Sequence, residues 1–405
     1  MKPKLLHVLG AGPWQLPTVR LAKSIGYRVL VTDVYADRPA YALADFHEVV
    51  DITDLERTLQ AALDHRIDGI ICDTTDVGVP TAAFVAERLG LPGIGYETAL
   101  NFTHKGRMRR LTENAGLVVP RYRVISSPVA LRNAASEIAY PLIVKPVDNQ
   151  SGRGVSRVSN DSGLEAAFQA AKSCSRSGDV LIEACVVGHE IIVDGFVVSG
   201  QPKILGVADK EPYPDAVTVS ARIHYPDGER RPDLDRIQAA TSATLSALGL
   251  LNGVFHAEFI VQARDVVPID VAARGGGCMI YSHLIPHVSG INVMRAMIEL
   301  AMGDLPAIEP ATVPRAANIE FIRMPPGRLA EIFGVNAAAA LPGVAAIHFN
   351  VQVGEQIGAL DDKDCRPGYV VALANTAAQV IDVSRRAKSL LSVRMDGTAG
   401  PVAVF

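Results

Sequence analysis

The sequence shows no large excess of either charge. Lys and Arg number 39 and Asp and Glu 43, so the formal net charge is -4 over 405 residues. A general nucleic-acid-binding protein usually carries a strong basic excess, so we expect no nucleic-acid partner, and any anion site must be built locally. Aromatic residues make up only 5%, with a single Trp, while apolar residues reach 49% and charged residues 20%. This composition excludes a disordered chain and favours helices and sheets over a carbohydrate-binding sandwich.

Cysteine pairs and long apolar runs are also missing. The five cysteines are odd in number, widely spaced and without a C-x-x-C pair, which argues against a zinc site or a disulfide framework and suggests free thiols in a reducing cytoplasm. No uninterrupted apolar stretch reaches about 18 residues, so no membrane span is expected. The short apolar run at the N-terminus lacks the h-region and cleavage site of a signal peptide, and we therefore predict a cytoplasmic protein.

The order of apolar segments predicts three domains. Over residues 1–100, short apolar strands alternate with helical patterns, which is typical of a parallel α/β sheet. Residues 101–305 contain consecutive strands with few helices between them, which indicates an α+β unit with an antiparallel sheet; an ATP-binding subdomain would span about 120–190. Residues 306–405 contain three further strand-like pieces and one helix, and they predict a small C-terminal α+β domain.

The first chemical motif is Gly10-Ala-Gly12 after an apolar strand, with Asp33 at the end of the next strand. This spacing is similar to a dinucleotide fold, in which an acid binds the ribose about 20 residues further on. The third glycine position, however, holds Gln15. Three interpretations stay open: a tight turn that opens a helix, a substrate-anion site at the helix N-terminus, and a nicotinamide site. Trp14 either lines a substrate pocket or packs on the first helix.

The second motif combines Lys145, at the end of PLIVKP, with the turn at 151–154. Glycines allow backbone N–H groups to approach phosphate oxygens, and a neighbouring lysine adds a point charge. The alternative is an ordinary hairpin with an exposed lysine. Glu183 and Glu190 each interrupt an apolar stretch and suit an adenine amine and ribose hydroxyls, because a buried carboxylate needs hydrogen bonds. They could instead face solvent on a half-exposed strand.

The third motif is a pair of acids, Glu258 and Asp270, on two strands joined by a short turn. If the strands pair antiparallel, the carboxylates converge on one face and need a cation between them. Oxygen ligands favour Mg²⁺ held together with nucleotide phosphates. Arg274 and the glycines at 275–277 follow at once and would clamp a developing phosphate or a carboxylate. Two unrelated exposed acids are the alternative, and the arginines at 107, 109 and 110 are expected on a solvated helix face.

Taken in order, these features resemble the ATP-grasp superfamily, specifically its carboxylate–amine ligases such as L-amino acid ligases and biotin-carboxylase-like proteins. The resemblance covers about the whole chain and implies an ATP-grasp fold with an N-terminal parallel α/β (pre-ATP-grasp) domain and a small C-terminal domain. By this resemblance, phosphates would contact Lys105, Lys145, Ser151, Gly152 and Gly154; adenosine would contact Glu183, Ala184, Val186 and Glu190; and magnesium would contact Glu258 and Asp270.

The resemblance also implies roles at the reacting centre. Arg274 matches the arginine after the second metal acid, and Lys210 resembles a lysine near the substrate cleft. Gly12, His256, Gly275, Gly276 and Gly277 are further substrate candidates. The chain departs from the family pattern at the second metal acid. Where the family often reads E-x-N-x-R, Asp270 stands in place of the glutamate and Ala272 in place of the asparagine ligand. The expected number of Mg²⁺ ions is therefore one or two.

The expected activity is an ATP-dependent ligation of a small carboxylate to an amine through an acyl phosphate, with release of ADP and phosphate. Two alternatives remain: an NAD-dependent oxidoreductase that uses the N-terminal G-x-G turn, and an ATP-binding protein without ligase activity. Relatives in this family are often homodimers, but the sequence itself does not decide the oligomeric state or the identity of the acid and amine.

Overall fold

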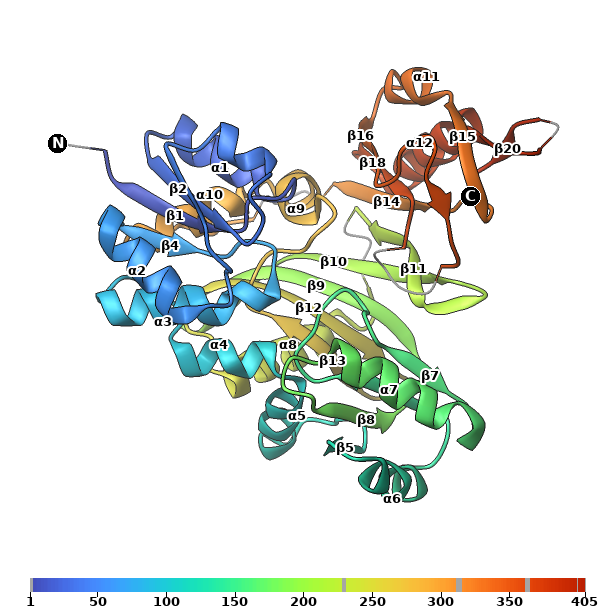
Figure 1. The fold of residues 1–405 in the computed structure, drawn as a ribbon, viewed down its shortest axis with the longest axis horizontal. Coiled ribbons are helices and arrows are strands. Elements are labelled where there is room, and N and C mark those ends of the chain that lie inside the picture. The colour runs from blue at the N-terminus through green and yellow to red at the C-terminus, as the bar shows by residue number, and fades with distance from the viewer. Residues whose placement is uncertain (1–2, 228–230, 311–314, 361–364, 399, 405) are drawn as a thin grey trace.

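The computed structural model describes residues 3–227, 231–310, 315–360, 365–398 and 400–404. Its N-terminal part is a four-stranded parallel sheet in the order β3-β2-β1-β4 (Figure 1), formed by β1 Leu5–Leu9, β2 Arg28–Asp33, β3 Phe46–Val49 and β4 Gly69–Ile71. Every residue of β1 is buried, as expected for a parallel strand covered on both faces. The predicted parallel α/β fold of the N-terminal region is confirmed.

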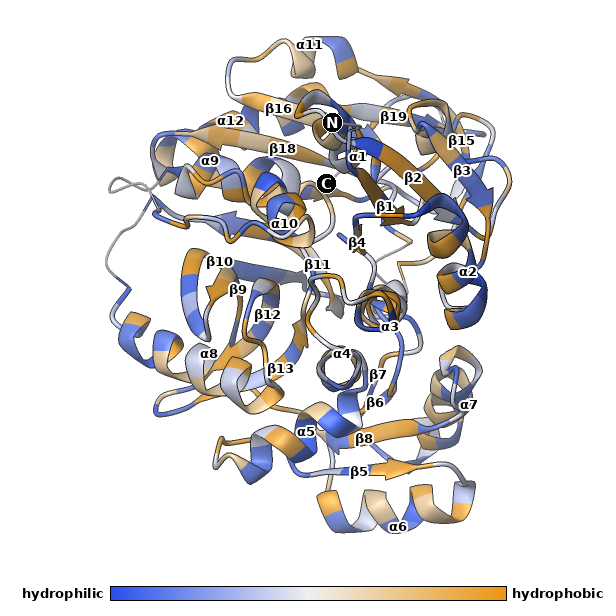
Figure 2. Cartoon of the chain, turned by 90° about the vertical axis from the view of Figure 1, so that its left-hand side faces the viewer, coloured by the Kyte–Doolittle hydropathy of each residue, from blue (hydrophilic) through white to orange (hydrophobic). Residues whose placement is uncertain are grey.

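Two helices connect these strands, α1 Leu16–Ser24 between β1 and β2 and α2 Leu55–His65 between β3 and β4, and α3 Val79–Leu89 follows β4. Asp54 caps α2, because its side chain accepts the N–H of Arg57. In Figure 2 the strands are largely hydrophobic, whereas the outer faces of the helices carry hydrophilic residues. The sheet therefore supplies a rigid base for the loops that follow β1 and β4.

Two helices, α4 Tyr96–Thr103 and α5 Lys105–Asn114, lead out of this part. The sequence predicts one helix over 103–116, but His104 adopts an extended conformation and divides the segment. Its Nδ1 accepts the N–H of Arg107 at 3.2 Å and so caps α5. Lys105 is consequently the first residue of α5.

The next unit is a four-stranded antiparallel sheet in the order β5-β8-β6-β7, formed by β5 Tyr122–Ile125, β6 Leu142–Pro146, β7 Ser156–Val158 and β8 Val180–Ala184. Helices α6 Pro128–Ile138 and α7 Leu164–Cys174 pack on it around a core that includes Leu131, Val144 and Phe168. The unit occupies the lower right of Figure 1, and it contains the predicted phosphate loop between β6 and β7.

A long eight-stranded sheet runs through the middle of the molecule, with the strand order β13-β12-β9-β10-β11-β14-β18-β16. Its strands are β9 His189–Val198, β10 Gln201–Tyr213, β11 Ala216–Tyr225, β12 Gly253–Val261, β13 Val266–Ala272, β14 Ala316–Ile322, β16 Val344–Phe349 and β18 Gly368–Ala374. Because β11 pairs with β14, the sheet crosses the predicted boundary at residue 305. The boundaries at 100 and 305 stay predictions, and the C-terminal strands extend the sheet of the preceding region.

Helices pack on both faces of this sheet: α8 Leu234–Leu248 shares a core with Ile191 and Val193, whereas α9 Ile285–Ser289 and α10 Val293–Ala301 share a core with Ile192 and Phe196 on the other face. The C-terminal region adds α11 Val335–Ala339, α12 Ala377–Leu390 and a small sheet of β15 Gly327–Phe333, β17 Gln356–Ile357, β19 Ser392–Met395 and β20 Val402–Ala403. The predicted helix and three predicted strands of this region are present, whereas β15, β19 and α11 were not predicted.

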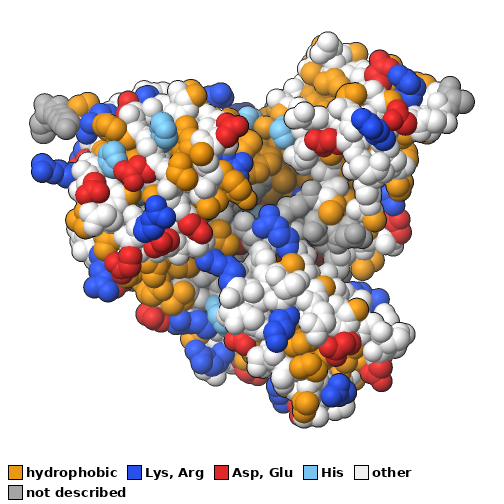
Figure 3. Space-filling view, viewed as in Figure 1, with side chains coloured by type: hydrophobic (Ala, Val, Ile, Leu, Met, Phe, Trp, Pro, Cys, Tyr) orange, Lys and Arg blue, Asp and Glu red, His pale blue; other side chains and the backbone are white. Residues whose placement is uncertain are grey.

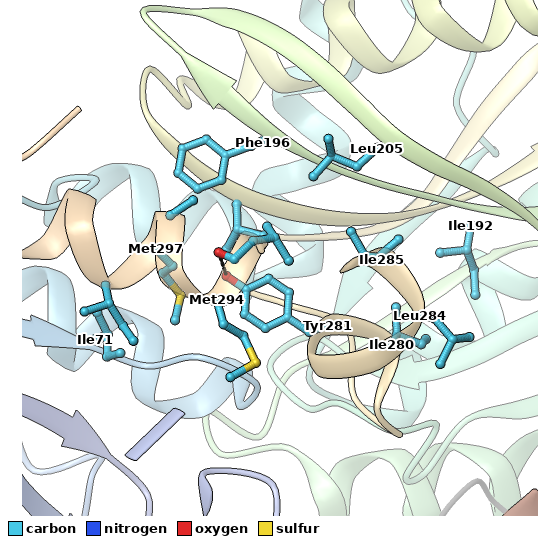
Figure 4. Close-up of a cluster of buried hydrophobic side chains, with 14 of the residues drawn as sticks. Ile71, Ile192, Phe196, Leu205, Ile280, Tyr281, Leu284, Ile285, Met294 and Met297 are labelled. Atoms are coloured by element: carbon cyan, nitrogen blue, oxygen red, sulfur yellow. Dashed lines mark hydrogen bonds between the residues drawn. The ribbon is translucent and has the colours of Figure 1, made fainter. Parts of the chain in front are cut away.

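The largest hydrophobic core joins the N-terminal domain to the long sheet. It brings Val8 and Ile71 together with Phe196, Tyr281 and Met294, and Tyr281 lies among these side chains in Figure 4. The Tyr281 hydroxyl donates to the carbonyl of Val293 at 3.0 Å, which satisfies its only polar atom. Within the described residues, no helix is long and apolar enough to cross a membrane.

Candidate functional site

A cavity of about 660 Å³ lies between the β5–β8 sheet and the long sheet. Most of the predicted ATP, metal and cleft residues line it: Lys105, Lys145, Ser151, Gly152, Glu183, Ala184, Val186, Glu190, Lys210, Glu258 and Asp270. Gly154 does not line it, because its backbone packs against α7, where an added Cβ would lie 3.0 Å from the carbonyl oxygen of Ala170. We refer to this space as the first cavity.

The two predicted phosphate lysines are both buried, and carboxylates hold them in place. Lys105 Nζ donates to the carbonyl of Asn149 at 3.0 Å and lies 3.1 Å from Asp270 Oδ2. Lys145 Nζ lies 2.6 Å from Glu183 Oε1. Burial lowers the pKa of Lys145, and the neighbouring Glu183 opposes this effect. Both cations therefore face the first cavity with their positions already fixed.

Arg109 is a member of this site that the sequence interpretation missed. It is fully buried, and its Nε and Nη2 contact the two carboxylate oxygens of Glu183 at 2.9 and 3.3 Å. Nη2 also donates to the carbonyl of Ile269 at 2.8 Å. The prediction that Arg109 lies on a solvated helix face is wrong. One signal in the sequence could have indicated that Arg109 faces the site: it lies four residues after Lys105, and residues four apart share one helix face.

Glu183 sits between Arg109 and Lys145 and is itself only 3% exposed. Burial alone would raise its pKa, but the two cations outweigh burial and lower the pKa to about 2. Both carboxylate oxygens are engaged inside the protein. An adenine contact through this side chain therefore has no support here, and the adenine-binding role of Ala184 and Val186 stays a prediction that depends on their backbone.

Lys210 bridges two predicted ligand-binding acids. Its Nζ is hydrogen-bonded to Glu190 Oε1 and lies 3.0 Å from Glu258 Oε2. Burial would lower the pKa of Lys210, but Glu190 and Glu258 raise it above its ordinary value. Lys210 is thus a charged group on the floor of the first cavity, which links the proposed ribose acid to the proposed metal acid.

The predicted metal pair is formed by Glu258 and Asp270, which are direct cross-strand partners on β12 and β13. Burial would raise the pKa of Asp270, but Lys105 and Lys145 lower it, so it is ionised at neutral pH. Among the described residues, no cluster of three or more His, Cys, Asp or Glu could hold a metal alone. Two carboxylates nevertheless fit Mg²⁺, which takes the rest of its ligands from phosphates and water.

Arg274 does not line the first cavity; it joins the long sheet to the N-terminal domain. Its Nε and Nη2 contact Asp76 Oδ1 and Oδ2 at 2.7 and 3.1 Å. The backbone N–H of Asp76 donates to Gln150 Oε1 at 2.7 Å. Asp76, which follows β4 in the run DTTD, was not predicted. It connects the arginine to the segment that begins the phosphate loop.

A second cavity, of about 360 Å³, lies beside the glycine run, and Gly276 and Gly277 line it together with Trp14. Gly275 does not line it: its N–H donates to the carbonyl of Asp73 at 2.8 Å, and an added Cβ would stand 2.3 Å from the Tyr281 ring. In Figure 3 the surface is hollowed where the three lobes meet, with hydrophobic side chains visible in the hollow.

Besides Gly275, two further substrate candidates lie outside both cavities. Gly12 belongs to the turn before α1, and its neighbours Pro13 and Trp14 line the second cavity in its place. His256 lies beneath the glycine run, where its Nδ1 is 2.7 Å from Asp194 Oδ1. Their substrate roles stay predictions.

The NAD-dependent alternative requires an available acid at the N-terminal turn, but both carboxylate oxygens of Asp33 are already engaged. One carboxylate oxygen of Asp33 accepts the N–H of Ala11 at 2.8 Å, and the other accepts the N–H of Tyr35 and lies 3.3 Å from Arg38 Nε. Asp33 thus closes the turn after β1. This arrangement matches the first of the three interpretations, a tight turn that opens a helix.

Two family models match the chain. An ATP-grasp domain matches residues 138–282, and L-amino acid ligase C-terminal domain 2 matches residues 320–396. Two sequence relatives are formate-dependent phosphoribosylglycinamide formyltransferases. The one from Prochlorococcus marinus (strain MIT 9303) is 34% identical over 339 residues, covering 76% of this chain and 79% of the relative. The one from Chlorobaculum tepidum is 34% identical over 193 residues, and the match spans about half of it, 48%.

A solved structure agrees in fold. The L-amino acid ligase from Bacillus licheniformis superposes with a TM-score of 0.82 at 20% identity, over 98% of this chain and all of that one. At this identity the likeness shows the fold alone. Because the Prochlorococcus relative aligns over most of both chains and the matched ATP-grasp domain contains every lining residue of the first cavity except Lys105, the chain belongs to the ATP-grasp family of carboxylate–amine ligases.

Proposed function

We propose that this protein binds ATP in the first cavity and uses it to join a small carboxylate to an amine. The observation that carries the proposal is the composition of that one cavity, where Lys105 and Lys145 face the loop at Ser151 and Gly152 together with the acids Glu258 and Asp270. A polyphosphate needs cations and backbone N–H groups, and a phosphate-bound Mg²⁺ needs carboxylates. Both requirements meet here.

To bind the phosphates, the lysines would exchange their carboxylate partners for phosphate oxygens. In the structure Lys105 pairs with Asp270 and Lys145 with Glu183. Glu258 and Asp270 would hold Mg²⁺, which would neutralise phosphate charge when bound. Lys105, now paired with Asp270, and Lys210, now paired with Glu258, would then turn toward the phosphates. One ion suits this donor set, because the position of the family's asparagine is Ala272, which is apolar.

The reaction would proceed in two steps. A carboxylate oxygen of the substrate attacks the γ-phosphorus, the bond from that phosphorus to the bridging oxygen breaks, and ADP leaves with the electron pair. The amine nitrogen then attacks the acyl carbon, inorganic phosphate leaves, and the nitrogen loses a proton to solvent. Because little covalent chemistry falls to the protein, its contribution is positioning and charge stabilisation. We place Arg274 and the N–H groups of Gly276 and Gly277 next to the acyl phosphate.

Other features of the proposal follow from the family. We infer domains at 1–100, 101–305 and 306–405, and the first cavity lies inside the domain at 101–305.

We also infer a cytoplasmic homodimer. Size-exclusion chromatography with light scattering measures the oligomeric state, and a monomer at all concentrations would contradict the dimer.

The test of the activity is release of ADP across a panel of acids and amines, with mass detection of the amide. Glu258→Gln is expected to reduce turnover at least about a hundredfold, because it removes one of the two carboxylates that would hold the Mg²⁺ that neutralises the phosphates. Glu331→Gln, at an exposed pair with Arg394, is the matched control and should leave turnover unchanged. Full activity of Glu258→Gln would disprove the metal assignment, and ATP binding without turnover on any pair would disprove the ligase function.

A further inference from the structure

The second cavity lies beside the glycine run, which we place at the proposed reacting centre. Its wall combines the turn before α1, the glycine run at 276–277 and the C-terminal strands β16 and β18. Gly276 lies six residues after Asp270, which lines the first cavity. A substrate held there would reach the acyl phosphate that we place beside the glycine run. At about 360 Å³ it falls at the small end of ligand pockets, roughly 300–1,000 Å³.

Aromatic rings form one side of this cavity. The ring centroids of Trp14 and His348 are 5.9 Å apart, those of Trp14 and Tyr369 6.0 Å, and those of His348 and Tyr369 5.3 Å. Met279, Tyr281 and Met294 add further apolar surface. Tyr369 is 1% exposed, and within the described part of the chain its hydroxyl has no hydrogen-bond partner. Trp14 and His348 are only partly buried and offer flat surface to a ligand, while the buried Tyr369 ring contacts both of them and adds one unused hydroxyl.

The cavity has little positive charge. Among the described residues that line it, Arg20 is the single Lys or Arg, and it lies exposed on α1. The buried acid Asp73 also lines it and is hydrogen-bonded to Thr18 Oγ1 and to Gln15 Nε2, the latter at 3.3 Å. A phosphate monoester carries a charge of about -1.5 to -2 and is recognised by clustered cations.

A second arginine, Arg366, does not add positive charge to the second cavity. Arg366 is buried, but its guanidinium carbon lies 3.5 Å from the ring centroid of Phe321, and it also contacts Cys278 Sγ at 3.9 Å. It is not among the residues that line the cavity. A phosphoribosyl amine, which the names of the sequence relatives describe, would therefore bring its phosphate next to a buried carboxylate and apolar rings.

We propose that the second cavity binds a substrate with an apolar, aromatic-sized body and no phosphate, held against Trp14, His348 and Tyr369. This assignment rests on the proposed ligase function and specifies its substrate class. It separates the chain from relatives named for a phosphoribosyl substrate, because the discriminating elements are the ring cluster and the shortage of cations. Arg20, at the edge of the cavity, would meet a single carboxylate of such a substrate.

The single tryptophan makes the cavity directly observable. Trp14 is the only Trp in the chain, so tryptophan fluorescence of the full-length protein reports this site without requiring turnover. The protein is titrated with L-phenylalanine, L-leucine and ribose 5-phosphate, each with Mg²⁺ and a non-hydrolysable ATP analogue. The amino acids should change the emission saturably, with half-saturation at a concentration at least about tenfold lower than that of ribose 5-phosphate.

A variant pair ties the signal to the ring cluster. His348→Ala should weaken L-phenylalanine binding about fivefold, the size expected for one lost aromatic contact. His47→Ala is the matched control, because His47 also stacks on a tyrosine, with its centroid 4.6 Å from that of Tyr41, but it does so on the N-terminal sheet. Equal affinities in the two variants would overturn the placement.

The remaining outcomes separate this assignment from the proposed function. Saturation by ribose 5-phosphate at an equal or lower concentration, or no emission change with any probe, overturns the assignment. ADP release with a phosphorylated amine but not with apolar amino acids overturns it too, while leaving the ligase function intact. Binding of the apolar probes without ATP turnover on any acid and amine pair supports the assignment and disproves the ligase function.

Discussion

Arg274 and Asp76, which are 198 residues apart in the chain, form a two-pronged ion pair at 2.7 and 3.1 Å. Both side chains are largely buried, so neither charge can be left alone without cost. Burial would lower the pKa of Arg274, but Asp76 raises it above its ordinary value. The pair connects the N-terminal domain to the strand that carries Asp270, and it holds the arginine in one orientation.

We predict that Asp76→Asn lowers both stability and turnover. The amide can accept only one of the two hydrogen bonds, which leaves part of the Arg274 guanidinium unsatisfied at a cost of about 1–3 kcal/mol. If Arg274 acts at the acyl phosphate, kcat should fall at least about tenfold, since small misplacements of such groups are expensive. Urea unfolding and ADP release measure the two effects.

The control for this substitution is Asp215→Asn. Asp215 also forms a two-pronged pair, with Arg323 at 2.7 and 2.5 Å, but on the surface. Exposed pairs contribute little to stability, so this variant should behave like the wild type. If the two variants behave alike, the position of Arg274 does not depend on Asp76.

A second prediction concerns Arg109, which holds Glu183 and the carbonyl of Ile269. Arg109→Met should reduce the free energy of unfolding by about 3–5 kcal/mol, because it leaves a buried carboxylate with one cation fewer. The affinity for ATP should fall as well, since Arg109 ties the β8 strand to the strand of Asp270. Chemical unfolding and ATP titration test these effects.

Arg110→Met tests the same change on the neighbouring residue, which is exposed on α5. Surface substitutions of this kind usually change stability by about 0.5 kcal/mol or less. A similar loss in both variants would indicate that α5 tolerates no change at all, and it would contradict a specific role for Arg109.

The sequence predicted which residues line the site better than it predicted the contacts between them. Lys145, Glu190 and Asp270 were identified from short motifs and Lys105 from the family resemblance, and all four line the first cavity. Such motifs are local, because each consists of a few residues at a strand end or a turn.

The unpredicted contacts depend on distant segments. Arg109 is buried only because Glu183 and Ile269 come to it from strands 74 and 160 residues away. An arginine in a helical pattern usually faces solvent, and no local signal marks the exception beyond its spacing from Lys105. In the same way, the pairing of β11 with β14 extends one sheet into a region that the sequence presents as separate.

A third prediction uses the departure at Ala272, which lies two residues after Asp270 on β13. Residues two apart on a strand share one face, so Ala272→Asn adds an amide oxygen beside the proposed metal acids. The Mg²⁺ concentration for half-maximal ADP release should fall several-fold, because carbonyl oxygens are magnesium ligands. Ala273→Asn, on the opposite face, should not lower it. An unchanged Mg²⁺ requirement in Ala272→Asn would contradict the proposed placement of the ion.

The last prediction follows from the lowered pKa of Glu183, about 2 in the folded protein against an ordinary value of 4.5. The folded state binds the proton less readily than the unfolded state, so the carboxylate stabilises the fold above about pH 4.5 and this stabilisation is lost as the pH falls toward 2. The difference corresponds to about 3 kcal/mol. Denaturant unfolding of wild type and Glu183→Gln should therefore show a smaller loss of stability on acidification in the variant, which is already destabilised at neutral pH. Glu165→Gln, at an exposed position on α7, should keep the wild-type slope. Parallel slopes for wild type and Glu183→Gln would show that Arg109 and Lys145 do not hold this carboxylate ionised.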